Sequence, residues 1–182
     1  MTDIITLNQS QQQKFDALNL TIELVPQSCW CNNLRSMLKR SQWDILRHKV
    51  YQEANHKCEI CQGVGPNHPV ECHEVWDYSD ELNIQKLTKL ISICPQCHFV
   101  KHIGLTYMRG KEYGDIAYKR FHDINELTGQ EAKLFYGLYR QQWQQRSVKD
   151  WKLDVSLLFQ YDIDIVQTKF KELDRKLFVH DL

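Results

Sequence analysis

Two Cys-x-x-Cys motifs, one at Cys58 and Cys61 and the other at Cys94 and Cys97, constrain this chain more than any other feature. Each motif can form a tight turn that directs two thiolates at one point, and four thiolates in a tetrahedral array suit Zn²⁺. A redox-active pair is the alternative interpretation, but a thioredoxin-like site needs only one such motif on a βαβ pattern. The sequence therefore predicts a structural zinc ion held by all four cysteines.

The 32 residues from 62 to 93 form an insertion between the motifs, with polar groups of its own. Residues 70–76 (VECHEVW) alternate as a strand does, and Asp80 is placed to cap a helix. That helix is predicted from an apolar stripe at Ile84, Leu87, Leu90 and Ile91. It should lead into the second Cys-x-x-Cys motif.

Histidines gather around the second motif. A short helix is expected from about Cys97 to Gly104, and it would place His98 and His102 one turn apart on the same face. The zinc ion would fix the strand at residues 70–76 against this helix and so bring His73 toward His98 and His102. Converging imidazoles and a carboxylate make a second metal site, which can orient a phosphate while a nearby histidine deprotonates water. The alternative is that these histidines are polar groups on a zinc scaffold.

The flanking segments predict a further pair of strands and several helices. Leu20–Val25 and Trp151–Leu157 both alternate apolar and polar residues, so they are predicted to pair in one small sheet. Trp30 is expected to anchor the core, and Cys29 and Cys31 to be packed thiols. Helices are predicted to end near Lys39, to begin at Ser41 and Asp115, to run from Thr128 to about Arg146, and to span Asp164–Leu177.

The charge of the whole chain does not point to nucleic acid, because 23 Lys and Arg balance 23 Asp and Glu. The stretch from 34 to 49 differs, since it holds several basic residues and a single acidic one, Asp44. We therefore treat it as a candidate face for DNA phosphates; the alternative is a solvated helix surface. Its basic residues are Arg35, Lys39, Arg40, Arg47 and Lys49.

The composition, with 42% hydrophobic residues, fits one compact domain over residues 1–182. Residues 1–20 lack an apolar stretch of the signal-peptide kind, and the chain has no apolar run long enough for a membrane span. A cytoplasmic protein that does not enter a membrane is therefore expected. In that reducing compartment, thiolates bind metal rather than form disulfides.

Three motifs, CEIC, ECHEVW and CPQCHFVKH, together resemble the HNH endonuclease family, in its subgroup with a zinc-stapled ββα-metal (treble-clef-like) fold. The stretches ELVPQSCWCNNLR and WKLDVS look like those of small stand-alone bacterial HNH proteins. The resemblance implies an α+β fold with an HNH core at about 56–104. Residues 20–55 and 113–178 would surround this core with helices and with a small antiparallel sheet that joins the N- and C-terminal strands.

The resemblance also implies roles for individual residues. His98 and His102 would hold a catalytic divalent ion, Mg²⁺, Mn²⁺ or another, and His73 would be the general base. The strand motif departs from the family, because Cys72-His73-Glu74 stands where Asp-His or His-His is common. In one register Cys72 takes the ligand position and His73 is the base. In the other, His73 is the ligand and Glu74 takes the base position.

Lys89 is a second departure, because the family usually has an Asn there that braces the loop. The predicted function is that of a metal-dependent HNH endonuclease that hydrolyses DNA, as a monomer or a homodimer, with His73, Glu74 and His98 as catalytic residues. The alternative is an inactive zinc module that binds nucleic acid or a protein partner. Lys89 and the neutral total charge favour the module, whereas the three histidines favour the nuclease.

Overall fold

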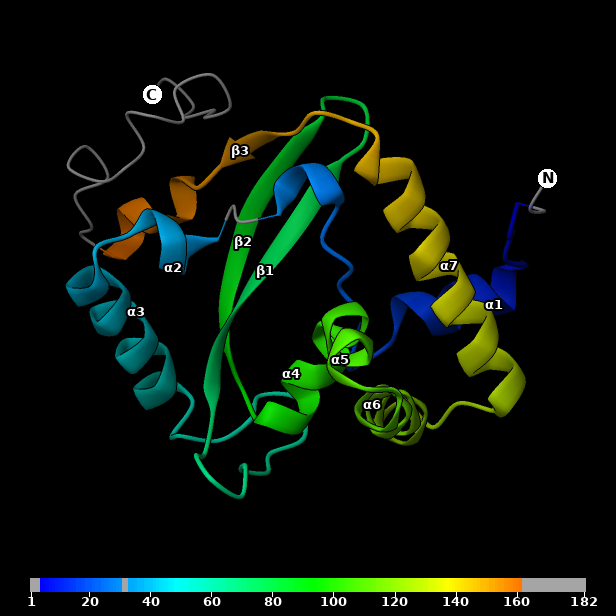
Figure 1. The fold of residues 1–182 in the computed structure, drawn as a ribbon, viewed down its shortest axis with the longest axis horizontal. Helices are drawn as coiled ribbons and strands as arrows, with labels where there is room; N and C mark the ends of the chain where they lie inside the picture. The colour runs from blue at the N-terminus through cyan, green and yellow to red at the C-terminus, as the bar shows by residue number, and fades with distance from the viewer. Residues whose placement is uncertain (1–3, 31–32, 162–182) are drawn as a thin grey trace.

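The computed structural model describes residues 4–30 and 33–161, and it is an α+β arrangement around a three-stranded mixed sheet (Figure 1). The strands are β1 (Glu71–Ser79), β2 (Ile84–Ile93) and β3 (Lys152–Asp154). The α-helices are α1 (Gln9–Asp16), α2 (Leu34–Met37), α3 (Arg40–Glu53), α4 (Pro95–Lys101), α5 (Ile103–Arg109), α6 (Lys111–Ile124) and α7 (Gly129–Ser147). Short 3₁₀ helices cover Gln27–Cys29 (η1) and Ser156–Tyr161 (η2).

The hairpin of β1 and β2 is the central element of the fold. The two strands are antiparallel and cross the molecule, and β3 joins β2 in parallel, which gives the order β1-β2-β3 (Figure 1). Glu71 pairs with Ile93 at one end of the hairpin, and His73 pairs with Ile91. Because Cys94 follows β2 directly, this end of the sheet lies beside α4 and the second cysteine motif.

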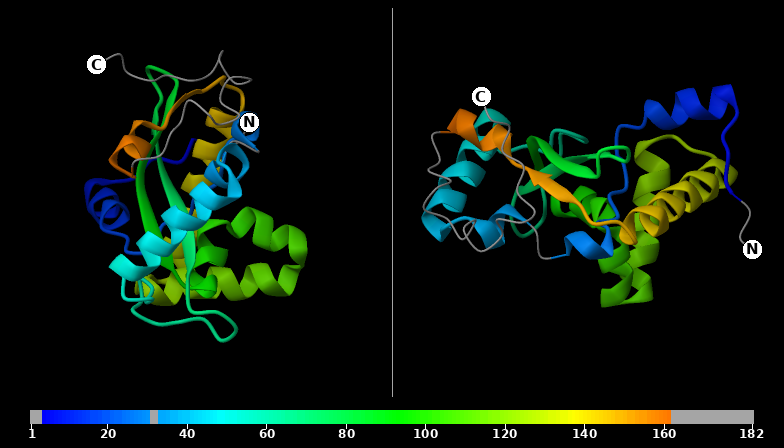
Figure 2. Two further views of the ribbon diagram at one scale, coloured as in Figure 1. Left: turned by 90° about the vertical axis from the view of Figure 1, so that its left-hand side faces the viewer. Right: turned by 90° about the horizontal axis from the view of Figure 1, so that it is seen from above.

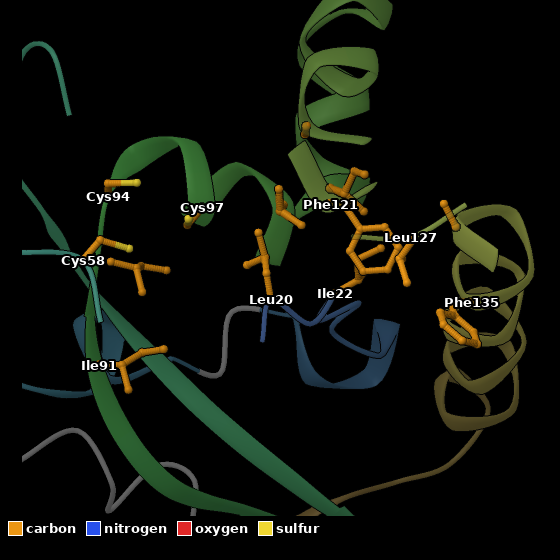
Figure 3. Close-up of a cluster of buried hydrophobic side chains, with 14 residues drawn as sticks. Leu20, Ile22, Cys58, Ile91, Cys94, Cys97, Phe121, Leu127 and Phe135 are labelled. Atoms are coloured by element: carbon orange, nitrogen blue, oxygen red, sulfur yellow. The ribbon is translucent and has the colours of Figure 1, made fainter. Parts of the chain in front are cut away.

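Two hydrophobic clusters pack against the sheet from opposite sides. Leu46 and Val50 of α3 belong to one cluster, together with Leu87 of β2. The other cluster joins Ile91 of β2 to α4, α6, α7 and the N-terminal segment. Figure 3 shows three of the motif cysteines at one end of this second cluster and Phe135 of α7 at the other. The views in Figures 1 and 2 place α2 and α3 on one side of the hairpin and α4 to α7 on the other.

The strand predicted at Leu20–Val25 is wrong: the segment has no regular secondary structure and belongs to no sheet. Its alternation does predict burial, since Leu20 and Ile22 are 0% and 2% exposed. A side chain replaces the neighbouring strand: the Asn125 amide accepts a hydrogen bond from the Leu20 N–H at 3.0 Å and donates one to the Leu20 carbonyl at 2.8 Å. The apolar pattern therefore recorded burial and not strand pairing.

The predicted partner, Trp151–Leu157, is a strand only over Lys152–Asp154, and it pairs with β2 in parallel. The small antiparallel sheet joining the two ends of the chain is therefore a wrong prediction. Trp151 and Val155 are buried as the alternation predicts. Beyond Asp154 the chain turns into η2, which ends the strand.

Strand β2 replaces the helix predicted to follow Asp80. Its apolar residues imitate helical spacing because a bulge at Thr88 shifts the register between Val75 and Trp76 of β1. Leu87 and Leu90 consequently share one hydrophobic cluster although they lie three residues apart, while Ile91 belongs to the other cluster. A strand covered on both faces gives a short apolar run that periodicity alone does not distinguish from a buried helix.

Capping signals locate one helix well. Helix α7 confirms the capping box at Thr128, whose side chain accepts from the Glu131 N–H. The capping box predicted at Ser41 is wrong, because α3 begins at Arg40 with Lys39 as its N-cap, and Gly104 lies inside α5 rather than ending a helix. Helix α6 begins at Lys111 rather than Asp115, and α2 ends at Met37 rather than near Lys39.

Two further predictions concern single segments. Trp30 is 55% exposed, so it is not the core anchor that we expected, whereas Cys29 is buried as predicted. The predicted helix Asp164–Leu177 and the predicted packed thiol of Cys31 lie outside the described residues. No helix in the described part of the chain combines the length and the apolar character needed to cross a membrane.

Candidate metal centres

The fold fixes both cysteine motifs in place. The first motif lies in the loop after α3, where Glu59 ties it to β2: the Glu59 N–H donates to the Ser92 carbonyl, and the Glu59 carboxylate accepts from the Ser92 N–H. The second motif begins at Cys94, the N-cap of α4, and continues into the helix. Pro95 stands in the first turn, where a helix needs no backbone N–H from it.

The four motif cysteines converge on one point. The sulfur atoms of Cys58, Cys61, Cys94 and Cys97 all lie within 4.8 Å of one another, and three of these residues are buried. The Cys61 and Cys94 sulfurs are 3.7 Å apart. A tetrahedral Zn²⁺ with sulfur ligands at about 2.3 Å requires sulfur–sulfur distances of about 3.8 Å. The cluster therefore fits a structural zinc ion.

Arg120 of α6 covers this cluster, which sequence analysis did not foresee. Its Nη2 donates to the sulfurs of Cys61 at 3.2 Å, Cys97 at 3.4 Å and Cys94 at 3.7 Å. Four thiolates around Zn²⁺ carry a net charge of −2, so a guanidinium at this position stabilises the charged cluster. The motif spacing gave no signal for this residue, because α5 separates α6 from the helix that carries the second motif.

A second cluster is made of three histidines. Ring nitrogens of His73 on β1, His98 on α4 and His102 at the junction of α4 and α5 lie within 4.8 Å of one another. The ring centroids are 4.8 to 5.2 Å apart, and the rings meet edge to face. The structure therefore brings together the three histidines that the sequence predicted to converge, and they form a candidate second metal site.

Glu23 supports His73 from the N-terminal segment. Its Oε2 lies 2.8 Å from His73 Nε2, and its Oε1 accepts from Lys101 Nζ at 2.7 Å. Lys101 is held in turn by the Thr21 hydroxyl at 2.7 Å. Burial alone would raise the pKa of Glu23, but the hydrogen bonds and charges of His73 and Lys101 lower it to about 2. Glu23 is thus an anion that holds the ring orientation of His73.

Glu71 supports His98 in the same way. Its Oε2 meets His98 Nδ1 in a short hydrogen bond, and its Oε1 lies 2.9 Å from His68 Nε2. The hydrogen bond from His98 lowers the pKa of Glu71 to about 2; burial opposes this effect, and the bond from His68 adds to it. Metal-binding histidines commonly give their second ring nitrogen to a carboxylate, which fixes the tautomer. Glu23 and Glu71 both fit that pattern, and sequence analysis missed both.

The buried surroundings favour neutral histidines, the form that binds metal. Burial lowers the pKa of His102 to about 3, and the nearby charges of His73 and His98 act in the same direction. Burial also lowers the pKa of His73, against the opposing effect of Glu23. The donor set is therefore three neutral imidazoles with two carboxylates behind them.

Glu74 does not belong to this cluster. Neighbouring residues of a strand point to opposite faces, and Glu74 points toward α2. Its carboxylate accepts from the Leu34 N–H at 2.9 Å and lies 3.2 Å from the Trp76 Nε1 donor. Burial raises the pKa of Glu74 to about 7 despite these hydrogen bonds. Cys72 shares this face, so the structure separates both neighbours of His73 from the histidine cluster.

The predicted DNA-binding residues also lie away from the histidines. They are carried by α2, by α3 and by Lys39 in the short link between the two helices, on the side of the sheet opposite α4 (Figure 1). Arg47 pairs with Asp44 at 2.7 Å, and Arg40 approaches the same carboxylate at 3.9 Å. Arg35, Lys39, Arg40 and Lys49 are exposed. The structure therefore leaves this basic face accessible but does not bring it together with the histidine cluster.

Comparison of the chain with protein-family models, curated proteins and solved structures found no match. The HNH resemblance accordingly rests on the motifs of the chain alone. These observations establish an α+β protein with a four-cysteine cluster that fits structural zinc. They add a three-histidine cluster as a candidate second metal site.

Proposed function

We propose that this protein is a metal-dependent endonuclease of the HNH type, which hydrolyses phosphodiester bonds in DNA. The observation that carries the proposal is the convergence of His73, His98 and His102, whose ring nitrogens lie within 4.8 Å of one another. A β-hairpin and the helix that follows it present these histidines, with the cysteine cluster at the end of the hairpin. This is the arrangement that the HNH resemblance implies.

The donor set indicates which ions suit the site. Imidazole ligands suit Zn²⁺, Ni²⁺ and related transition metals, whereas Mg²⁺ prefers oxygen ligands. We therefore expect transition metals to support activity better than Mg²⁺. When bound, such an ion stabilises charge on a phosphate oxygen and lowers the pKa of a coordinated water.

The three histidines and their two carboxylate partners have different roles in the proposed site. His73 is 2% exposed, whereas His98 and His102 are partly exposed, so a phosphate would approach from the side of His98 and His102. The buried position of His73 favours the register in which it is a ligand, and not the general base. Glu23 and Glu71 hold the rings of His73 and His98 in the orientation that binding requires.

The test is a plasmid-nicking assay with Mn²⁺, Ni²⁺, Zn²⁺ or Mg²⁺ added to protein that retains its cysteine-bound zinc. We expect cleavage with the transition metals, and loss of cleavage in His98→Ala. His122→Ala is the matched control, because His122 is a partly exposed histidine on α6, outside both clusters, with Asp123 as its neighbour. Wild-type protein that binds these ions but cuts no DNA would refute the proposal.

One observation favours a second function, a zinc module that binds a nucleic acid or a protein without cutting. Lys89 stands where the HNH family usually has a bracing Asn, and its Nζ lies 3.3 Å from a Glu59 carboxylate oxygen. DNA binding without cleavage in any of the four metals would support this function. Absence of both binding and cleavage would favour a protein partner.

A further inference from the structure

We propose that His68, a residue outside the predicted catalytic set, is the general base that accepts the proton of the attacking water. The inference rests on the proposed function, because it assigns the base for that reaction. A base must lie within hydrogen-bonding reach of the water, directly or through one further water. The side chain must also keep a free lone pair and exchange its proton with solvent.

The other acid–base groups around the cluster fail these conditions. His73 is 2% exposed and shares Nε2 with Glu23. Both carboxylate oxygens of Glu23 are engaged, one by His73 and one by Lys101, and both oxygens of Glu71 are engaged by His98 and His68. Glu74 lies on the other face of the strand.

His68 keeps a ring nitrogen free and is open to solvent, and Glu71 links it to the histidine cluster. Its side chain is 51% exposed, and its Nε2 lies 2.9 Å from Glu71 Oε1. In the neutral ring this hydrogen bond makes Nε2 the donor and leaves Nδ1 as the free acceptor. The other oxygen of Glu71 holds His98, so a single carboxylate separates the His68 ring from a ring of the metal cluster. A carboxylate that orients a histidine in this way also stabilises the imidazolium that forms when it takes a proton.

The loop that carries His68 is fixed to the same framework. The Gly65 N–H donates to the Pro69 carbonyl at 2.9 Å, which closes the loop around His68. Gly65 also packs tightly: a Cβ there would lie 2.3 Å from the His68 carbonyl oxygen and 2.6 Å from Pro95 Cδ. Because Pro95 begins α4, the loop is held against the helix that carries His98 and His102.

The reaction balances with water as the only co-reactant. The water oxygen forms a bond to phosphorus while one water proton passes to His68 Nδ1. The phosphorus bond to the leaving oxygen breaks, and its electron pair stays with that oxygen, which takes up a proton from solvent. His68 then returns its own proton to solvent.

The main test compares His68→Gln with wild type in single-turnover cleavage. The Gln amide can still donate to Glu71 but accepts no proton at neutral pH. We expect the cleavage rate to fall by about a hundred- to ten-thousandfold, the usual contribution of a general base. Calorimetric titration with Ni²⁺ should give the same stoichiometry and affinity as wild type. Exogenous imidazole should restore cleavage in His68→Ala, because the vacated position is open to solvent.

Four results would overturn the assignment. If wild type cuts DNA and His68→Gln cuts equally fast, His68 is not the base although the nuclease stands. If His68→Gln loses Ni²⁺ affinity along with cleavage, His68 acts by holding Glu71 and His98 in place. If imidazole fails to restore His68→Ala, the lost group was not a proton acceptor. A wild type that never cuts refutes the nuclease itself, and the base assignment with it.

A labelling experiment gives a readout independent of activity. Diethyl pyrocarbonate modifies exposed histidines, and peptide mass mapping measures the rate at each one. A duplex oligonucleotide, added without the second divalent ion, should protect His68 if the scissile phosphate lies beside it. His48 on α3 lies on the basic face and serves as the comparison. Protection of His48 without protection of His68 would overturn the assignment.

The loop itself provides a matched pair of variants. Gly65→Ala introduces a Cβ that clashes with backbone and Pro95, so it should displace His68 and lower the cleavage rate as His68→Gln does. Gly63→Ala adds a Cβ at an ordinary 3.5 Å from Cys61 Sγ and should leave the rate unchanged. Equal rates in both variants would contradict the assignment.

Discussion

The two ligand clusters of this protein differ in how they are enclosed. The cysteine cluster uses four like donors, and three of the four cysteines are buried. Arg120 covers it and donates to three of its sulfurs. The histidine cluster uses three donors, of which two are partly exposed, and anionic carboxylates support it from behind.

This difference indicates a division of labour. A tetrahedral zinc ion with four protein ligands has no position for a substrate, so its contribution is folding free energy. Three protein ligands leave a tetrahedral ion a fourth position for water or phosphate, which is the arrangement that the proposed nuclease requires. The same helix, α4, carries residues of both clusters, so the cysteine cluster positions the histidine cluster. We refer to the cysteine cluster as the closed cluster and to the histidine cluster as the open cluster.

The largest effect is expected when the closed cluster is broken. Cys94→Ser removes a buried thiolate and should abolish most of the folded population, because structural zinc contributes on the order of 10 kcal/mol to folding in small zinc domains. Circular dichroism and elemental analysis check this: wild type should carry one tightly bound zinc per chain. Folded, metal-free protein would contradict the closed cluster's structural role.

Breaking the open cluster should spare the fold. His98→Ala removes one ligand, and since loss of a supporting residue alone commonly costs about ten- to a hundredfold in metal affinity, loss of a ligand should cost more. Calorimetry with Ni²⁺ measures the affinity, and thermal unfolding should show little change. Unfolding of His98→Ala to the extent seen for Cys94→Ser would erase the distinction between the clusters.

A smaller effect is expected from the carboxylate behind His73. Glu23→Gln keeps the shape but loses the charge, and it should weaken Ni²⁺ binding by about ten- to a hundredfold. Glu81→Gln, in the exposed turn between β1 and β2, is the control. Metal affinity that is the same in both variants would show that Glu23 does not orient His73.

The guanidinium over the closed cluster gives a kinetic comparison. Arg120→Met removes hydrogen bonds to charged sulfurs, each worth about 1.5–3 kcal/mol when such a bond is well formed. Because Arg120 is only partly buried, we expect a more modest outcome, zinc release to a chelator that is faster by roughly tenfold. Lys119→Met, a neighbouring exposed cation paired with Asp123, should release zinc at the wild-type rate. Equal release from both variants would remove Arg120 from the cluster's support.

The smallest effect is expected from the basic face, which lies apart from both clusters. Arg40→Gln should leave metal binding unchanged. It should reduce the slope of log affinity against log salt concentration for DNA binding by about 1, the contribution of one phosphate contact. Fluorescence anisotropy across a salt series measures this slope. A slope identical to that of wild type would indicate that Arg40 belongs to a solvated helix surface.

The motifs predicted both clusters because ligand spacing is a local property. Cys-x-x-Cys makes one turn, and His98 and His102 lie one helical turn apart whatever surrounds them. Glu23, Glu71 and Arg120 could not be found in this way, because carboxylates and guanidiniums are common and only the fold brings these three to the clusters. The carboxylate next to His73 in the sequence, Glu74, is the one that the strand turns away.

Strand pairing was the least predictable part. Leu20 and Ile22 are buried as their alternation requires, but the amide of Asn125 satisfies the backbone where a strand was expected. In β2, the bulge at Thr88 gave three-residue spacing that imitates a helix. Both errors arise because apolar periodicity reports which side chains are buried and not which group accepts the backbone hydrogen bonds.

The Asn125 clamp also sets an order of events during synthesis. Asn125 fastens Leu20 to the end of α6, and 105 positions separate the two residues in the chain. Leu20 leaves the ribosome early but is clamped only after Asn125 has emerged. Both cysteine motifs and all three histidines of the second cluster precede Asn125 in the chain, so their ligands can meet before the N-terminal segment is fastened to α6. Translation therefore delivers the ligands of both candidate metal sites before the residue that fixes the N-terminal segment.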